Sequence, residues 1–324
     1  MGQPQPDPGS GSFAAPMVLK FSGIRLRLRT ELRDALELVL IPGLAAVLPW
    51  RFCFAIFKRL ATMHWLYRAP CEAALRGARE RGWAGSDEVR WLRVRRLVTL
   101  VDHADHYLGL WRGDAWMGQH LQVEGAWPAP DQAALLLTFH WGAGYWGLRH
   151  AAVNGLRPHA LVASLESHAF EGRTVLSWYA RSRTAHVART LGSPTIDVAQ
   201  NLKQVVRALH DGHSLLGVMD VPADQAKASM PVEMLGRQAW VPRGLLRLAV
   251  DQQAPAVVYI TGLNTSTGQR FLRIKPLGVE ATTEKLAVRV FKELEQLIVE
   301  DAPAWHFWGI AERFFRAPEP ACEP

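Results

Sequence analysis

His140 is the residue of this sequence best placed to act in catalysis. It follows a short apolar run, residues 133–139, that is typical of a buried strand. Gly142 and Gly144 then supply the free backbone conformations of a tight turn, and a helical pattern starts at about Tyr145. A histidine at the carboxyl end of a strand lies where open α/β sheets bind ligands. The alternative is a histidine that ends the strand and bonds a neighbouring carbonyl.

Asp220 and Arg243 are two further candidates from the pattern alone. A continuous apolar run from residue 213 ends at Asp220, so this carboxylate is either a site residue or a cap. Arg243 follows Pro242 at an expected helix start, where free backbone N–H groups favour anions. Arg243 could therefore bind an anionic group of a substrate.

The elements that must position these residues alternate after Gly125 between strand and helix patterns. This alternation predicts an α/β fold with a mixed sheet flanked by helices. The predicted strands are 133–139, 159–163, a short one near 196, 213–220, 230–235, 256–262 and 270–275, the last at an edge. The predicted helices are 145–155, 172–182, 202–212, 242–253, 283–300 and 303–315.

Composition narrows the possible functions. The chain has 324 residues, of which 49% are apolar, and 37 basic against 30 acidic residues give a net charge of +7. This charge favours an anionic partner or surface. No P-loop or G-x-S-x-G motif is present, and the three cysteines have neither a metal-site spacing nor an even disulfide count. We therefore expect a reducing, cytoplasm-facing location and no nucleic acid, metal or bound cofactor.

The chain before residue 126 is expected to have three parts, of which the first two are a tail and a membrane-associated element. Residues 1–16 are predicted to be a flexible tail, as are 317–324. Residues 17–66 contain arginines followed by the apolar runs 35–50 and 52–57, and are predicted to be a membrane-associated helical element. Three forms are possible: a helix buried in a soluble core, a tilted or re-entrant membrane helix, and a single span anchored by Arg51 and Lys58.

Residues 67–125 are predicted to be a helical part that precedes the α/β core, 126–316. Ser86, before Asp87 and Glu88, is the expected helix start. The polar cluster that follows on this helix is expected to form a solvated face, and the neighbouring arginines a solvated or lipid-facing one. These residues are Asp102, His103, Asp105 and His106, and Arg90, Arg93, Arg95 and Arg96.

Seven segments, in this order, resemble the late acyltransferases of lipid A biosynthesis, which transfer lauroyl or myristoyl groups and belong to the lysophospholipid acyltransferase group. The resemblance covers roughly residues 28–316. The segments are Ile41-Pro42 through Lys58, Thr138-Phe139-His140-Trp141-Gly142, Trp178 to Arg183, Gly217-Val218-Met219-Asp220, 231–237, Arg247-Leu248-Ala249, and 302–308 with its Pro-x-x-Trp pattern.

The resemblance implies a glycerolipid acyltransferase-like fold at the cytoplasmic face of a bacterial inner membrane. The implied enzyme takes a fatty acyl group from acyl carrier protein or coenzyme A, as co-substrate, and passes it to a hydroxyl of a lipid or glycolipid. It implies that His140 is the general base, and that Trp141 and Gly142 contact substrate. Near the family's basic position stand Arg181 and Arg183, which would bind substrate or stabilise an oxyanion.

The family pairs its histidine with an acid five residues on, but this chain has Tyr145 there. An acid bonded to the second ring nitrogen fixes the tautomer and stabilises the imidazolium. Three explanations stand: Tyr145 orients the ring, a distant acid such as Glu166 or Asp220 does so, or the site is inactive. The chain is thus expected to be an acyltransferase or a catalytically degenerate, membrane-bound lipid- or acyl-binding member of the same family. A soluble α/β hydrolase is a third possibility, without the expected nucleophile elbow.

Overall fold

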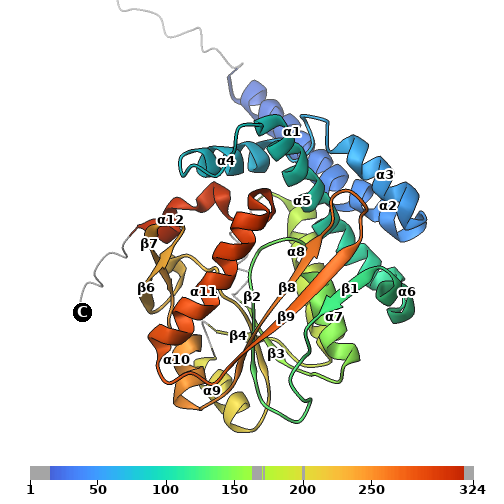
Figure 1. Cartoon of the computed structure of the whole chain (residues 1–324). Coiled ribbons are helices and arrows are strands. Elements are labelled where there is room, and N and C mark those ends of the chain that lie inside the picture. The colour runs from blue at the N-terminus through green and yellow to red at the C-terminus, as the bar shows by residue number, and fades with distance from the viewer. Residues whose placement is uncertain (1–14, 163–169, 171, 199–200, 317–324) are drawn as a thin grey trace, which may run out of the picture.

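A seven-stranded mixed sheet forms the centre of the molecule (Figure 1). The computed structural model describes residues 15–162, 170, 172–198 and 201–316. The strand order is β1-β9-β8-β2-β5-β3-β4, and every pair of neighbours is parallel except β8 and β9. The strands are β1 (Leu121–Glu124), β2 (Leu135–Thr138), β3 (His159–Val162), β4 (Ile196–Asp197), β5 (Leu215–Val218), β8 (Ala256–Leu263) and β9 (Arg270–Gly278).

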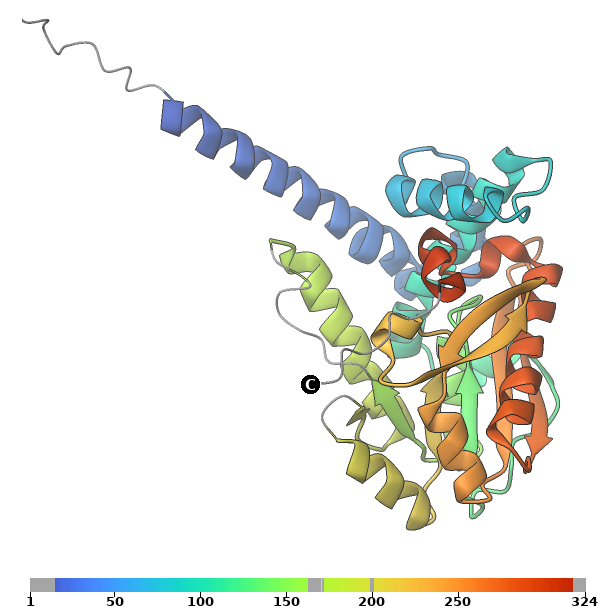
Figure 2. The same ribbon diagram turned by 90° about the vertical axis from the view of Figure 1, so that its left-hand side faces the viewer.

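Helices cover both faces of this sheet, so the predicted α/β class is confirmed (Figure 2). All four residues of β2 are buried, as expected for a central parallel strand. Leu135 and Leu137 belong to one hydrophobic cluster and Leu136 to the other, because successive side chains point to opposite faces. The helices after β2 are α7 (Tyr145–Val153), α8 (Thr174–Leu191), α9 (Leu202–His210), α10 (Gly244–Asp251), α11 (Thr283–Glu300) and α12 (Glu312–Phe315).

Several predicted elements differ from the observed ones. The predicted strand at 230–235 is β6 (Ser229–Met234), which pairs with β7 (Arg237–Pro242) in a separate hairpin. Pro242 ends that hairpin and does not start a helix, since α10 begins at Gly244. The strand predicted at the sheet edge is β9, but it is not an edge strand because β1 pairs with its outer side. The predicted helix 303–315 is instead three short turns that end in α12.

The N-terminal region is a run of helices that partly joins the core. It consists of α1 (Ala15–Asp34), a π-helical segment (Ala35–Leu40), α2 (Ile41–Val47) and α3 (Trp50–Leu60). Figure 2 shows α1 projecting from the body of the molecule. Cys53 and Phe57 of α3 are fully buried, and no helix within the described ranges is long and apolar enough to cross a bilayer. The single-span form of the predicted membrane element is therefore not supported.

The helical part that follows contains α4 (Arg68–Arg79), α5 (Glu88–Trp111) and α6 (Asp114–Gln119). Asp87, rather than Ser86, caps α5 by accepting from the Arg90 N–H. The predicted solvated face of α5 is wrong, since Asp105 is 0% and His106 1% exposed. Arg95 and Arg96, predicted at the surface, are likewise buried. α5 buries these polar side chains because Asp105 pairs with Arg270 of β9, His106 with His186 of α8, and Arg95 with the Trp305 carbonyl.

Candidate active site

A tight turn follows β2 and carries His140. Gly142 has a φ of +69°, and a Cβ there would lie 2.3 Å from the Thr261 carbonyl oxygen, so the turn requires glycine at this position. The N–H of Gly142 donates to the Ala304 carbonyl at 3.0 Å, and the N–H of Ala143 to the Thr261 carbonyl at 3.0 Å. The turn is thereby held to β8 and to residues 302–308, the C-terminal segment.

Asp220 meets His140 because β2 and β5 are parallel neighbours in register. Thr138 pairs with Val218 at the ends of these strands. His140 and Asp220, each two positions further along the chain, therefore lie side by side. His140 Nδ1 lies 2.9 Å from Asp220 Oδ1, and the His140 backbone N–H donates to the same carboxylate at 2.9 and 3.0 Å. Asp220 is 0% exposed, whereas the His140 side chain is 43% exposed.

The hydrogen-bond partners assign the tautomer of His140. An ionised carboxylate only accepts hydrogen bonds, so the proton of the neutral ring lies on Nδ1 and donates to Asp220. Nε2, on the side of the ring away from Asp220, then carries the lone pair. Such an imidazole can accept a proton at Nε2 while Asp220 stabilises the imidazolium that forms.

The C-terminal segment closes over this pair. The indole Nε1–H of Trp305 donates to Asp220 Oδ2 at 2.9 Å, and the Phe307 ring lies 4.2 Å from the His140 ring, centroid to centroid. The N–H of His306 donates to the His140 carbonyl at 2.8 Å, and its Nε2 bonds the Gly142 carbonyl at 2.7 Å. Burial lowers the pKa of His306 to about 3, so this ring is neutral and its Nε2–H is the donor.

Tyr145 does not orient His140, and that explanation of the altered motif is wrong. Its side chain is buried on α7, where its hydroxyl bonds Thr190 and its ring packs on His186. Burial raises the pKa of Tyr145 to about 12, so the hydroxyl stays protonated. Glu166, the other distant acid considered, lies outside the described residues. Asp220 is the acid that contacts the ring.

The two arginines of the predicted basic position have different surroundings. Arg183 makes a two-pronged ion pair with Asp102 at 2.8 and 2.7 Å, and also donates to the Tyr179 hydroxyl. Asp102 is largely enclosed, and although burial opposes it, Arg183 holds the pKa of this carboxyl below its usual range. Arg183 thus joins α8 to α5, and its charge is already matched.

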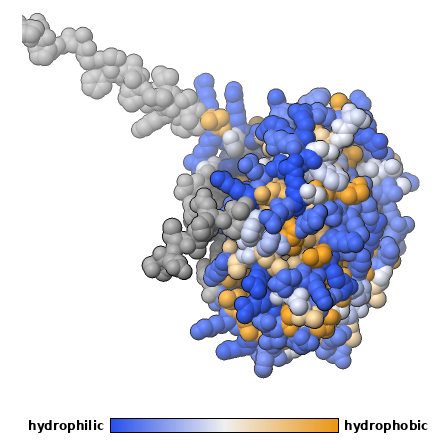
Figure 3. All heavy atoms as spheres, turned by 60° about the vertical axis from the view of Figure 1, so that its left-hand side comes forward, coloured by the Kyte–Doolittle hydropathy of each residue, from blue (hydrophilic) through white to orange (hydrophobic). Residues whose placement is uncertain are grey.

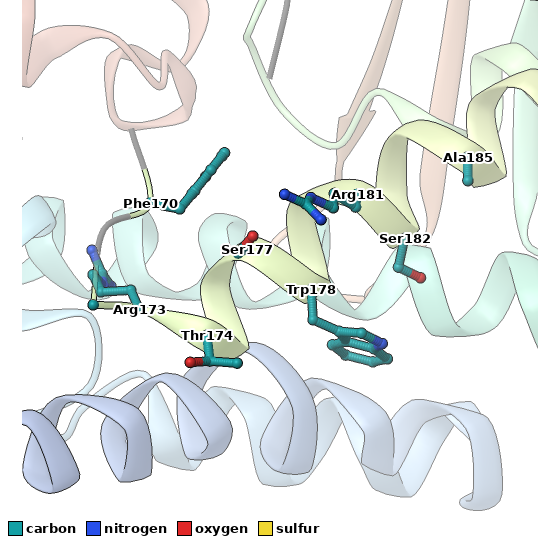
Figure 4. A pocket seen from close by; sticks show the side chains of 9 residues that line it. Phe170, Arg173, Thr174, Ser177, Trp178, Arg181, Ser182 and Ala185 are labelled. Carbon is teal, nitrogen blue, oxygen red and sulfur yellow. The ribbon is translucent and has the colours of Figure 1, made fainter. Parts of the chain in front are cut away.

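Arg181 is the arginine that remains open to a ligand. Within the described residues its guanidinium makes no hydrogen bond or ion pair, and it is exposed. It lines a pocket of about 590 Å³ with Phe170, Trp178 and residues on the first turns of α8. Figure 4 shows Arg181 and Phe170 on the same side of α8, and Trp178 on the side that faces the blue N-terminal helices. The pocket therefore combines one unmatched cation with two aromatic side chains.

Of the other predicted substrate contacts, Arg243 is exposed, whereas Trp141 and Gly142 have structural roles. Arg243 is exposed immediately before α10, with its backbone N–H bonded to Ala228. Trp141 is 4% exposed and forms a β-bridge with Trp305, so it packs beneath the turn and is not an open substrate contact. Gly142 serves the turn through its backbone.

Sequence reasoning missed the roles of Trp305, His306 and Phe307 at this site. The Trp-His-Phe-Trp sequence at 305–308 was visible as part of the resemblance, but nothing in its spacing indicates contact with residues 140 and 220. The one signal in the sequence for a functional role was the grouping of aromatic residues and a histidine at 305–308. Its contacts follow from the tertiary fold alone.

No family model matches the chain, and no curated protein matches it. Membership of the acyltransferase family therefore stays an expectation from the ordered sequence segments. The fold and the geometry at His140 carry the functional interpretation.

Proposed function

We propose that this protein is an acyltransferase that moves a fatty acyl group from acyl carrier protein or coenzyme A to a hydroxyl of a lipid or glycolipid. The observation that carries the proposal is the pair formed by a half-exposed His140 and a fully buried Asp220, at the carboxyl ends of two neighbouring parallel strands. A base with this partner suits transfer between an acyl thioester and a hydroxyl.

In the proposed reaction Nε2 of His140 takes the proton of the acceptor hydroxyl as its oxygen attacks the thioester carbonyl. The tetrahedral intermediate then expels the thiolate, which takes that proton back from the imidazolium. Asp220 holds the ring in the required tautomer throughout. The Gly142 and Ala143 N–H groups already have backbone partners, so the donor to the oxyanion has to come from another group. Arg181, whose charge no carboxylate matches among the described residues, is proposed to bind an anionic part of the substrate.

The pocket beside Arg181 supports an anionic, partly apolar substrate. Its aromatic side chains suit an apolar chain or ring, and its free guanidinium suits a phosphate or carboxylate. Arg173, which also lines it, is bonded to Asp34 at 2.9 and 2.7 Å and so closes the pocket wall toward α1. The acyl thioester donor and the acceptor lipid both combine these two properties.

Contact with the cytoplasmic face of an inner membrane is the second part of the proposal. Leu26, Leu28 and Leu32 of α1 are 67%, 63% and 62% exposed, an unusual density of apolar side chains facing solvent. Exposed arginines alternate with them, at 25, 27 and 29. Figure 3 shows apolar and hydrophilic side chains intermixed where the described part of α1 joins the body. The exposed arginines suit the headgroups of an anionic bilayer, and the leucines between them are available for apolar contact.

The test is thiol release and acyl transfer by the purified protein. Acyl carrier protein and coenzyme A thioesters of several chain lengths are supplied with labelled acyl groups and extracted membrane lipids. We expect His140→Ala to lower turnover by about 10²-fold or more, as loss of a general base does. His210→Ala, an exposed histidine on α9, is the matched control and is expected to leave turnover unchanged.

The alternative is an acyl-binding module without chemistry. Its signature is binding of the acyl thioester with no thiol release above background, or release that His140→Ala leaves unaltered. Either result rejects the enzyme. The membrane part is separable, since it is tested by sedimentation with anionic and neutral vesicles.

A further inference from the structure

We infer that Trp305 is a positioning residue for His140, acting through the carboxylate of Asp220. The inference deepens the proposed function and rests on it for its kinetic consequence. Trp305 Nε1–H donates to Asp220 Oδ2 at 2.9 Å, while Asp220 Oδ1 accepts from His140 Nδ1 at 2.9 Å. The two oxygens of one carboxylate therefore connect the indole to the imidazole.

The carboxylate needs this second ring because its own side chain does not fix its orientation. The terminal torsion of an aspartate is broad, so its oxygens rotate unless both are held. Asp220 is 0% exposed, and all the hydrogen bonds to its carboxylate among the described residues come from His140 and Trp305. Without the indole N–H, His140 would be the sole partner of a buried charge, and the ring would follow the carboxylate as it turns.

The indole is itself rigidly held, so it can serve as the fixed point. Trp305 is 0% exposed, and its ring packs on Trp308 at 4.9 Å and Phe314 at 5.5 Å between centroids. Its backbone forms a bridge to Trp141, and its carbonyl accepts from Arg95 Nη1 at 2.9 Å. The C-terminal segment thereby imposes its position on the carboxyl ends of β2 and β5.

Trp308 supplies a matched control within the same segment. It too is 0% exposed, but its Nε1–H donates to the backbone carbonyl of Ala302 at 2.6 Å and not to Asp220. Trp305→Phe and Trp308→Phe each remove one indole N–H and the same volume from one cluster. We expect Trp305→Phe to lower kcat about 10-fold or more with KM unchanged, and Trp308→Phe to keep kcat within about 3-fold.

A second measurement reads the ring directly. In ¹⁵N spectra of histidine-labelled protein, with His140→Gln assigning the signal, wild type is expected to show one tautomer protonated at Nδ1. Trp305→Phe is expected to show a mixture of tautomers, and Trp308→Phe the wild-type signal. If Trp305→Phe does not fold, benzothienylalanine at position 305 keeps the shape and removes only the N–H.

The two proposals fail in different ways. A wild-type tautomer together with a wild-type kcat in the position 305 variants overturns the inference while the acyltransferase stands. A changed tautomer in a protein without any His140-dependent thioester turnover rejects the acyltransferase and leaves Trp305 as the residue that orients the ring. Equal losses of kcat in the Trp305 and Trp308 variants also overturn the inference, because they indicate a general packing effect.

Discussion

Asp220 binds both the backbone N–H and the ring Nδ1 of His140, although the two residues are 80 positions apart in the chain. One carboxylate therefore fixes the end of β2 and the side chain that follows it. The acid comes from the neighbouring strand, so the helix after the turn is not required to supply it. Replacement of the expected acid by Tyr145 thus leaves the geometry of a base and its partner intact.

The glycine turn gives the first prediction. Gly142→Ala places a Cβ 2.3 Å from the Thr261 carbonyl oxygen at a φ of +69°, whereas Gly144 has a φ of −69° and open space beside it. We expect Gly142→Ala to reduce the free energy of unfolding by more than about 2 kcal/mol. Gly144→Ala is expected to change it by less than about 1 kcal/mol. Urea unfolding measures both, and similar values for the two variants would refute the close backbone approach.

The ion pair between Arg183 and Asp102 gives the second prediction. The Asp102 side chain is 14% exposed, so Asp102→Asn leaves a guanidinium largely unmatched and is expected to cost about 3 kcal/mol of stability. The surface pair Arg68–Glu72 is the comparison, with side chains 69% and 44% exposed. Glu72→Gln is expected to cost less than about 0.5 kcal/mol. Thermal unfolding of the two variants decides, and equal losses would count against a structural role for Arg183.

The buried pair of Arg270 and Asp105 gives the third prediction. Both side chains are 0% exposed, and the guanidinium lies 3.9 Å from the Trp50 ring and 4.5 Å from the Trp146 ring. Asp105→Asn removes the matching charge and is expected to cost about 3–5 kcal/mol. The apolar double variant Asp105→Leu with Arg270→Met is expected to recover a substantial part of that loss. A double variant less stable than Asp105→Asn would mean that the pair itself is net stabilising.

Protonation of His306 gives the fourth prediction. Burial, followed by the neighbouring Arg95, lowers the pKa of His306 from its ordinary 6.5 to about 3. Between these values the unfolded chain binds the proton and the folded chain does not, so stability falls as the pH falls from 6.5 toward 3. The same sign holds for His103, His106 and His186, whose pKa values burial lowers to about 4.

The measurement is the slope of unfolding free energy against pH between 6 and 4. His306→Gln removes one such group and is expected to reduce the loss on acidification by up to about 1.4 kcal/mol per pH unit. Asp105 and Asp301, whose pKa values burial raises to about 6, act in the opposite sense, so the variant is compared with wild type rather than with a flat line. An unchanged slope would show that His306 titrates normally. His64→Gln, exposed after α3, is the control.

Much of the α/β core could be predicted because its signals are local. The apolar run before His140 and the glycines after it predict β2, the turn and α7, and the last long helix was predicted with its observed bounds, Thr283–Glu300. The pairing of Asp220 with His140 stayed one of three explanations. Its choice depends on β5 lying beside β2 in register, which no spacing in the chain reveals.

The errors on α5 share one physical cause, which is burial of polar groups by tertiary pairing. Asp105 and His106 have the composition of a solvated helix face, but Arg270 from β9 and His186 from α8 match them inside the protein. The strand at Arg270 was predicted at an edge, and this was wrong because β1, which is far away in the sequence, pairs with its outer side. Secondary-structure propensity and hydrophobic periodicity describe single elements, whereas these contacts join elements that are far apart in the sequence.

Asp220→Asn tests whether the buried carboxylate makes His140 a general base. The amide keeps the shape and can still accept from Trp305, but its NH₂ group presented to His140 favours the ring proton on Nε2, which then cannot act as a base. We expect a folded protein whose kcat for acyl thioester turnover falls by about 10²- to 10⁴-fold with little change in KM. A variant that turns over thioester within about 3-fold of wild type would contradict it.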